Sequence, residues 1–304
     1  MKKSILICGG TGFLGYHLAK KLQKLNWKVF SISTNKPTKI RKIKSVKYFS
    51  CDVSQKKKLY SILNKIDVDI VINFSGYVDH SNKQKTISSH YTGLKNLSNY
   101  YAKKNIFKFI QIGSSLEYGK NKSPHKENIK IKKNQLNSPY SLSKYLSSEF
   151  LINAGFKHDL PYIILRPYLI YGPYQDINRI IPFIIDKCLE DKIFPTSIGH
   201  QKRDFLYIND FIKIIYKLII DKKIKKKILN IGTGKPIKIR DIIKLINKKI
   251  GRGRPIYGAI KLRKDESKIY YPNVKSLKAI IKNFKFTSLN IGLNKTIKYY
   301  AKKR

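Results

Sequence analysis

Short runs of consecutive apolar residues recur along the first half of the chain. They cover residues 4–8, 28–32, 46–50, 69–74, 107–112 and 162–165. Continuous apolar runs of this kind are typical of strands that are buried on both faces of a parallel sheet. Helices are expected between them, at 16–25, 56–64, 90–103 and from 138 onward. This alternation of strand and helix predicts an α/β fold.

The second half of the chain continues with patterns of both kinds. Residues 178–189 (NRIIPFIIDKCL) predict a helix, and 228–234 (ILNIGTG) predict a strand and turn that return to the core. Residues 237–251 carry apolar side chains at i, i+3 and i+4, which is the pattern of an amphipathic helix. A loop, a strand and a final helix are expected over 255–304. We find no internal repeat, and the turn-rich GRGRP (251–255) is too short to separate domains.

Length and composition are those of a globular protein. A chain of 304 residues is long enough for about two domains, or for one large α/β unit with an added lobe. Its residues are 42% hydrophobic and 12% aromatic, which excludes a disordered chain. The most apolar stretch, FIKIIYKLII, is interrupted by Lys213 and Lys217, so no segment approaches the roughly 20 apolar residues that span a bilayer.

The expected compartment is the cytoplasm. The N-terminus enters a strand at once and has no small-residue cleavage site, so we expect no signal peptide. Three cysteines that lie far apart argue against a disulfide framework and against a zinc cluster: Cys8, Cys51 and Cys188. The six histidines show no ligand spacing, and we expect no metal.

The charge balance is extreme, with 64 Lys and Arg against 18 Asp and Glu and a net charge of +46. One interpretation is a nucleic-acid or anionic-membrane partner. The other is a composition that is rich in lysine everywhere. We favour the second because the lysines are spread along the chain and only 9 of the 64 basic residues are arginine. Neither a specific nucleic-acid partner nor a membrane partner is expected.

A glycine-rich turn follows the first predicted strand. GGTGFLG places Gly9, Gly12 and Gly15 between that strand and the first predicted helix. Glycine is needed there because a side chain would block the approach of a pyrophosphate to backbone N–H groups at a helix N-terminus. The turn therefore predicts a dinucleotide site.

The stretch SPYSLSKYLSSE (138–149) carries the candidate chemistry. Tyr140 and Lys144 are four residues apart, so they share one face of a helix that Ser138 can cap and Pro139 can begin. A cation beside a phenol favours the phenolate and lowers its pKa from about 10, which suits proton transfer. The alternative is an ordinary amphipathic helix with an exposed lysine.

A third motif, SSLEYG (114–119), follows the strand predicted at 107–112. The three motifs, in this order and spacing, resemble the extended short-chain dehydrogenase/reductase family (NAD-dependent epimerases and dehydratases). Among its members the nucleotide-sugar 4-ketoreductases, which reduce NDP-4-keto-6-deoxyhexoses, are the most similar. The resemblance runs from Ile5 to about Tyr300.

The resemblance implies a Rossmann-type doubly wound parallel sheet with a smaller C-terminal α/β substrate-binding lobe. The NAD(P)-binding domain is expected over 1–167, with returning segments near 204–233, and the sugar-nucleotide lobe mainly over 168–304.

The resemblance also implies a set of site residues. The catalytic residues would be Tyr140, Lys144 and Ser114. The cofactor would contact Gly9, Gly12, Phe13, Leu14, Gly15, Ser33, Thr34, Asp52, Val53, Ser75, Gly76, Tyr140, Lys144 and Pro167. The substrate would contact Ser115, Tyr118, Arg179, Arg203 and Arg263. Asp52 has a second interpretation as a cap of the helix predicted at 56–64, and both roles are compatible.

The end of the second predicted strand bears on the choice of cofactor. An acid at this place binds the ribose 2′-hydroxyl of NAD, but the chain has SISTN at 31–35. An Asp would repel the 2′-phosphate of NADP, whereas Ser33 or Thr34 could donate a hydrogen bond to it. We therefore favour NADP, with NAD as the alternative.

Several positions depart from the family pattern. The dehydratases have an Asp-Glu pair where this chain has Ser115 and Leu116. Because Leu cannot transfer a proton, dehydration is disfavoured. Glu117 is one position too late and is expected to face elsewhere. His90 stands where relatives have the first Asn of an Asn-x-x-Gly-Thr-x-Asn motif, whose last Asn matches Asn96.

Two further positions concern the substrate diphosphate. Leu169 replaces an Asn that touches the diphosphate in many relatives, so that contact must move or be absent. Arg203 would clamp the diphosphate, while Asp204 and Asp210 would place a loop and cap a helix. The alternative for Arg203 is a salt bridge to Asp204 or Asp210.

The function implied by the resemblance is reduction of a nucleoside-diphosphate 4-keto-6-deoxysugar at C4, as in the making of deoxysugars for surface polysaccharide. The first alternative is an NAD-dependent nucleotide-sugar 4-epimerase that uses the same residues. A different class is a non-catalytic member that senses the cofactor or binds nucleic acid. A homodimer is also expected, paired through the helices at 90–103 and 140–153.

Overall fold

The computed structural model describes residues 3–77, 82–136, 138–262 and 266–303. The chain forms two compact units. The first comprises residues 1–119, 130–166 and 214–229, and the second 120–129, 167–213 and 230–304. The segment 120–129 thus belongs to the second unit, although the chain on both sides of it belongs to the first.

The first unit is built on a seven-stranded sheet with the strand order β10-β6-β5-β4-β1-β2-β3. Its strands are β1 (Ser4–Cys8), β2 (Lys28–Ser33), β3 (Lys47–Ser50), β4 (Ile70–Asn73), β5 (Lys108–Ile112), β6 (Tyr162–Pro167) and β10 (Lys227–Ile231). Parallel pairing joins β3, β2, β1, β4, β5 and β6 in turn. The strand order reverses between β1 and β4, and open α/β sheets bind ligands at the carboxyl ends of the strands at such a point.

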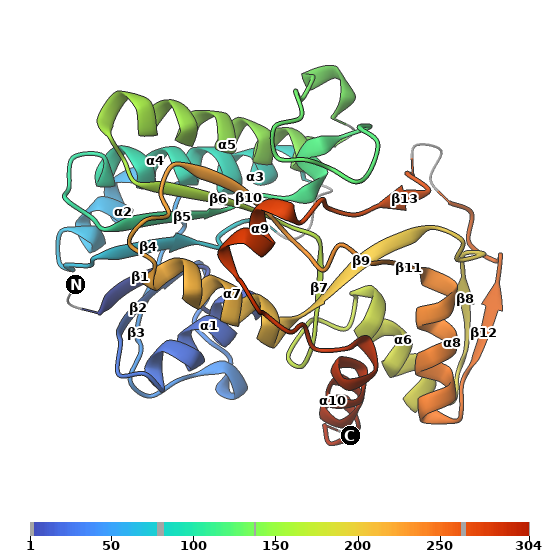
Figure 1. Ribbon diagram of the computed structural model, residues 1–304. Coiled ribbons are helices and arrows are strands. Elements are labelled where there is room, and N and C mark those ends of the chain that lie inside the picture. Colours follow the sequence, from blue (N-terminus) through green and yellow to red (C-terminus); the bar gives the residue numbers. More distant parts are fainter. Residues whose placement is uncertain (1–2, 78–81, 137, 263–265, 304) are drawn as a thin grey trace. The chain divides into compact units, whose positions relative to one another are not determined.

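Helices cover both faces of this sheet. They are α1 (Phe13–Gln23), α2 (Lys56–Leu63), α3 (Lys83–Ile87), α4 (Gly93–Tyr101), α5 (Pro139–His158) and α7 (Ile208–Ile220), and a π-helical turn, η2 (Ser88–Thr92), joins α3 to α4. Figure 1 shows α3, α4 and α5 on one side of the sheet and α1 and α7 on the other. The Rossmann-type sheet predicted from the sequence is confirmed.

Helix α5 is longer than the stretch that predicted it. Its N-cap is Ser138, whose Oγ accepts a hydrogen bond from the Ser141 N–H at 3.1 Å, and Pro139 occupies the first turn. The helix ends at Asp159, which adopts the left-handed conformation with φ 50°. Both start signals that the sequence showed are confirmed.

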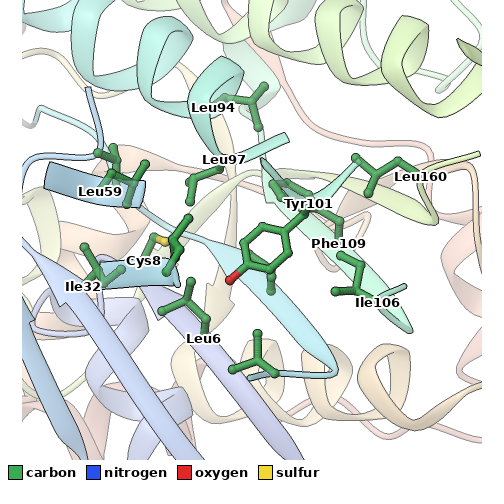
Figure 2. Close-up of a cluster of buried hydrophobic side chains, with 14 of the residues drawn as sticks. Leu6, Cys8, Ile32, Leu59, Leu94, Leu97, Tyr101, Ile106, Phe109 and Leu160 are labelled. Carbon is green, nitrogen blue, oxygen red and sulfur yellow. The ribbon is translucent and has the colours of Figure 1, made fainter. Parts of the chain in front are cut away.

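One hydrophobic cluster of the first unit packs α4 against the sheet. Leu94, Leu97 and Tyr101 follow the i, i+3, i+7 spacing of one helix face and are buried. Figure 2 shows the Tyr101 ring among Leu6, Cys8 and other apolar side chains of this cluster, with Phe109 beside it. This packing fixes α4, and with it η2, against the strands that lead to the carboxyl edge.

The described residues of the second unit form small sheets and several helices. The strands are β7 (Leu169–Tyr171), β8 (Ile193–Thr196), β9 (Lys202–Tyr207), β11 (Pro236–Lys238), β12 (Arg254–Tyr257) and β13 (Ile269–Tyr270). Strand β9 pairs with β7, β11 and β13, and β8 pairs with β12. The helices are α6 (Ile180–Leu189), α8 (Ile239–Ile250), α9 (Lys275–Ile280) and α10 (Leu289–Ala301).

Two buried acids of the second unit hold loops. Asp204 accepts hydrogen bonds from the backbone N–H groups of Thr233, Gly234 and Lys235. Asp210 accepts from the N–H of Thr287 at 2.6 Å and from its hydroxyl at 2.9 Å. The loop-placing role expected for these acids is therefore seen in both, while Asp210 lies in the first turn of α7.

The stretch 211–220, which was tested above as a membrane segment, forms the larger part of α7. Within the described residues no helix is both long enough and apolar enough to cross a membrane.

Strand β5 carries a buried cation that the sequence analysis did not single out. Lys108 is 1% exposed, and its Nζ donates to the backbone oxygen of Leu218 at 2.6 Å and to that of Asp221. These carbonyls belong to the C-terminal end of α7, which a cation stabilises. Burial lowers the pKa of Lys108 to about 8, and the Asp221 carboxylate opposes this shift.

The burial of Lys108 predicts a pH-dependent stability. An unfolded lysine titrates near 10.4, so between about 8 and that value the unfolded chain binds more protons than the folded chain. The stability contributed by this site therefore rises with pH across that window. We expect the melting temperature of the wild type, relative to that of Lys108→Met, to increase from pH 7 to pH 9.5.

The control is Lys47→Met, which changes an exposed lysine of β3. Its melting temperature relative to wild type should stay constant over the same range. A constant difference for Lys108→Met as well would contradict the prediction.

Candidate active site

The glycine turn lies at the carboxyl end of β1, at the switch point of the sheet. Gly9 has φ +79°, and a Cβ there would lie 2.9 Å from the Phe74 carbonyl carbon and from the Ser75 nitrogen. A Cβ on Gly15 would lie 2.3 Å from the Gly9 oxygen. Gly12 is the N-cap of α1, whose first turn contains no acid. The turn thus keeps side chains away from a helix N-terminus, which suits a pyrophosphate.

Phe13 and Leu14 begin α1 and are half-buried. The end of β2 lies beside the turn, since the Ser33 hydroxyl accepts a hydrogen bond from the Thr11 N–H at 3.3 Å. Arg41 donates from Nη1 to the Thr11 oxygen at 3.3 Å, and Thr34 is exposed. The stretch from 31 to 41 contains no acidic residue. The edge of the candidate dinucleotide site next to β2 therefore holds the Arg41 guanidinium and the hydroxyls of Ser33 and Thr34, while residues 31–41 contribute no carboxylate.

The loop after β3 is fixed from α4. Asp52 Oδ1 accepts from the Ser54 N–H at 2.8 Å, which forms a local turn before α2. Asn96 Nδ2 donates to the backbone oxygens of Val53 and Ser54, at 3.0 Å each. Asn96 thus holds the segment that the resemblance places next to the adenine.

His90 lies in the π-helical turn η2 and is buried. Its ring covers Gly76, where a Cβ would lie 1.9 Å from the His90 Cε1. The ring also meets Tyr140 edge-on, with centroids 5.1 Å apart and planes at 80°. Ser75 is held by Asn73 Oδ1, which accepts from the Ser75 N–H at 3.0 Å. His90, which departs from the family pattern, therefore packs against Gly76, a predicted cofactor contact, and against Tyr140, the candidate catalytic tyrosine.

Helix α5 brings Tyr140 and Lys144 to the carboxyl end of β5. Lys144 is 4% exposed, and its Nζ donates to the Ile112 oxygen at 2.8 Å. The same Nζ lies 5.9 Å from the centroid of the Tyr140 ring. Ile112 is the last residue of β5, two residues before Ser114. Lys144 is therefore not the exposed lysine that the alternative interpretation expected.

Ser114 is the N-cap of a short 3₁₀ helix, η3 (Ser115–Tyr118), and is itself buried. Its Oγ accepts from the Leu116 N–H at 3.1 Å. Burial lowers the pKa of Lys144 to about 8, while the negative charge of Glu117 opposes the shift. A lysine whose pKa lies close to neutral pH, placed beside a phenol, is suited to controlling the proton of that phenol.

Glu117 is fully buried and faces the interior of the first unit. Its carboxylate accepts from the Ser114 N–H at 2.7 Å, from the Ser148 hydroxyl at 2.8 Å and from Arg166 Nε at 2.9 Å. Leu116, in contrast, is 45% exposed. Glu117 was expected from the sequence to face elsewhere than the dehydratase acid, but its partners, Arg166 and Ser148, were not predicted. The rarity of arginine in this chain was the one available signal for Arg166.

The substrate residues predicted in the first unit are both buried. Ser115 is 8% exposed. Tyr118 is 0% exposed, and the guanidinium carbon of Arg166 lies 4.8 Å from its ring centroid. The Tyr118 side chain is therefore enclosed within the first unit.

The other predicted substrate residues belong to the second unit. Arg203 donates from Nη2 to Glu266 Oε1 at 2.6 Å, so its salt-bridge partner is neither Asp204 nor Asp210. Arg179 is the exposed N-cap residue of α6. Leu169 lies on β7 and is 40% exposed, and Pro167 is half-buried. Arg263 lies outside the described residues.

Comparison with known proteins places these features in one family. The model of the "NAD dependent epimerase/dehydratase family" matches residues 5–232. A putative UDP-glucose 4-epimerase of Methanocaldococcus jannaschii is 30% identical in an alignment 292 positions long, which covers 91% of this chain and 92% of that protein. CDP-abequose synthase of Salmonella typhimurium is 23% identical, over 92% of this chain and 93% of that protein.

A solved structure shows the same fold over nearly its whole length. The UDP-glucuronic acid 4-epimerase of Bacillus cereus, in complex with UDP-glucuronic acid and NAD, superposes with a TM-score of 0.86. It is 24% identical and covers 99% of this chain and 100% of its own. With a family match across more than half of its length and a 30% identical relative across nine-tenths of it, this chain belongs to the NAD dependent epimerase/dehydratase family.

Proposed function

We propose that this protein is an NAD(P)H-dependent 4-ketoreductase acting on a nucleoside-diphosphate 4-keto-6-deoxysugar. The observation that carries the proposal is the buried Lys144, held on the last carbonyl of β5 and 5.9 Å from the Tyr140 ring, with Leu116 where a dehydratase has an acid. The arrangement supplies a proton to a carbonyl oxygen but no acid–base pair for removing water.

The first unit fits a dinucleotide, because its glycine turn forms a cradle that a Cβ would fill. The turn and the start of α1 would hold the pyrophosphate, Asp52 and Val53 the adenine, and Ser75 and Gly76 the remainder, while the cofactor contact of Pro167 stays a prediction. Lys144 would bind the nicotinamide ribose hydroxyls. When bound, the reduced nicotinamide supplies a hydride.

Proton transfer is the task of this chain's own residues. As the C4 carbonyl carbon gains a hydride, its oxygen gains negative charge. The Tyr140 hydroxyl gives that oxygen a proton, so that the ketone becomes an alcohol and the tyrosine a phenolate. The Lys144 ammonium stabilises the phenolate, and the Ser114 hydroxyl donates a hydrogen bond to the reacting oxygen. Arg179 and Arg203 of the second unit stay predictions for binding the diphosphate.

A second candidate is a nucleotide-sugar 4-epimerase, because the 30% identical relative is a putative UDP-glucose 4-epimerase. Such an enzyme would oxidise and then re-reduce C4 with the same three residues. The two candidates differ in cofactor balance, since a reductase consumes NAD(P)H stoichiometrically. Incubating the protein with UDP-glucose and with NDP-4-keto-6-deoxysugars, and following cofactor oxidation and product mass, separates them. Epimerised UDP-glucose without net cofactor oxidation would overturn the reductase proposal.

Replacing Tyr140 by Phe removes only the hydroxyl that carries the proton. We expect turnover to fall by about 10²–10⁴-fold with little change in fold or cofactor binding. Lys144→Ala should lose turnover and also weaken cofactor binding, and Ser114→Ala should cost less than Tyr140→Phe because other donors remain. Steady-state kinetics and NAD(P)H fluorescence titration measure both quantities.

The matched control is Tyr145→Phe, which removes a hydroxyl from the same helix and should keep wild-type turnover. Near-full ketoreductase activity of Tyr140→Phe would show that the proton comes from another group.

We further propose that this chain prefers NADP, although the solved relative is bound to NAD. The support is the absence of an acid from residues 31–41 and the position of Arg41 on the Thr11 carbonyl. Arg41→Ala should weaken NADPH binding roughly tenfold, the worth of a charged hydrogen bond, and leave NADH binding unchanged. Ser33→Asp should shift the preference toward NADH. Equal affinity of the wild type for both cofactors would contradict the proposal.

We also propose a homodimer formed through η2–α4 and α5. Along α5, Leu142, Leu146 and Phe150 are half-buried at i, i+4 spacing, and Phe150 meets Tyr91 edge-on at 6.1 Å. Phe150→Glu should convert the dimer to a monomer in light scattering, because its charge would enter an apolar interface, while Lys95 beside it tolerates the change in the monomer. A wild type that is monomeric at micromolar concentration would contradict this proposal.

A further inference from the structure

Glu117 collects donors from three different elements of the first unit. The Ser114 N–H follows β5, the Ser148 hydroxyl belongs to α5, and Arg166 Nε belongs to β6. Glu117 and Arg166 are 0% and 2% exposed. A buried carboxylate with this set of partners connects the loop of the candidate catalytic serine to the helix of the candidate catalytic tyrosine and lysine.

The neighbouring residues are shaped for this carboxylate. A Cβ on Gly113 would lie 2.3 Å from Glu117 Oε1, so the glycine leaves the space that the carboxylate fills. The Arg166 guanidinium is held on its other side by the face of the Tyr118 ring. Gly113, Glu117 and Arg166 therefore form one packed unit around the negative charge.

The charge of Glu117 also acts on Lys144. Ser148 is one helical turn after Lys144, so the carboxylate bound to Ser148 lies on the same face of α5. Burial disfavours the ammonium form of Lys144, and the Glu117 charge favours it. The other groups around Lys144 are Tyr140 from its own helix, His90 from η2 packed on Tyr140, and Arg166 from β6 paired with Glu117. Among Glu117 and these three groups, Glu117 alone carries the negative charge that stabilises an ammonium.

We propose that Glu117 is a positioning residue of this site: it holds Ser114 by the backbone, binds the Lys144 helix through Ser148 and supplies the buried negative charge that favours the Lys144 ammonium. Its effect on turnover rests on the function proposed above, whereas its effect on the charge of Lys144 does not. Without Glu117, the effect of burial would be unopposed and the pKa of Lys144 would fall further. The neutral amine would neither stabilise the Tyr140 phenolate nor hold the ribose as a cation.

The test follows cofactor affinity as a function of pH, because Lys144 is expected to bind the nicotinamide ribose. Binding of NADH or NADPH, whichever is tighter, is measured by fluorescence from pH 6 to pH 10 for wild type, Glu117→Gln, and Glu149→Gln as an exposed carboxylate of the same helix. The wild type should lose affinity with a midpoint near pH 8, the titration range of Lys144. Glu117→Gln should lower that midpoint by about one unit or more, and Glu149→Gln should leave it unchanged.

A second variant separates this role from a merely structural one. Glu117→Gln leaves the Arg166 guanidinium buried without its carboxylate, which destabilises the fold, whereas Glu117→Gln with Arg166→Gln removes both charges. The double variant should recover the melting temperature lost by the single variant, and its midpoint should stay below that of the wild type, with the loss of the Arg166 cation offsetting part of the shift. A single variant that loses melting temperature but keeps the wild-type midpoint would show that Glu117 is only structural and would overturn the proposal. The double variant also provides the test if the single variant does not fold.

Two further outcomes are decisive. A wild-type affinity that does not change between pH 7 and pH 9.5, or a midpoint that is the same with and without Glu117, would overturn the proposal. None of these measurements uses a sugar substrate. If every ketosugar is rejected, the proposed function fails while the comparison of midpoints still decides the role of Glu117.

Discussion

Helix α5, which carries the candidate catalytic residues, is held in the first unit by paired polar groups on its buried face, and the geometry of the candidate site depends on this. Ser141, Ser143, Lys144, Ser147 and Ser148 are all buried along α5. Serines are small enough to let the helix approach its neighbours closely, but each buried hydroxyl must find a partner. Ser147 binds the His90 oxygen, Ser148 binds Glu117 and Lys144 binds the Ile112 oxygen. A shift of α5 would break several of these bonds at once, so Tyr140 and Lys144 have one position.

A second constraint operates at the opposite end of the cofactor site. Backbone segments from β1, α1 and β4 approach each other so closely that Cβ atoms at Gly9 and Gly15 would collide with main-chain atoms. The result is a helix N-terminus left open to an anion, at the point where the strand order reverses. Hydrogen-bonded polar groups along α5 thus define one end of the proposed dinucleotide site. The turn, whose glycines have no side chains, defines the other end.

Departures from the family pattern are accommodated within this frame. His90 brings a ring where relatives have an amide, and Gly76 supplies the space for it. Leu116 removes a proton-transferring group and faces outward at 45% exposure, while the acid one position later turns inward to bind Arg166. This short segment therefore lacks the proton-transferring acid of the dehydratases. It has instead an acid, Glu117, that stabilises the site through its bond to Arg166.

The sequence by itself determined those features that depend on neighbours a few residues apart. Apolar runs identified the strands, the glycine spacing identified the turn, and the i, i+4 spacing put Tyr140 and Lys144 on one helix face, because backbone periodicity is local. Only the tertiary structure decided which charges are buried and which groups pair. Lys108 reaches the end of α7, Glu117 meets Arg166, and Arg203 pairs with Glu266 instead of its near neighbour Asp204. These partners lie 110, 49 and 63 residues apart, so their pairing depends on how distant segments pack, which no local pattern encodes.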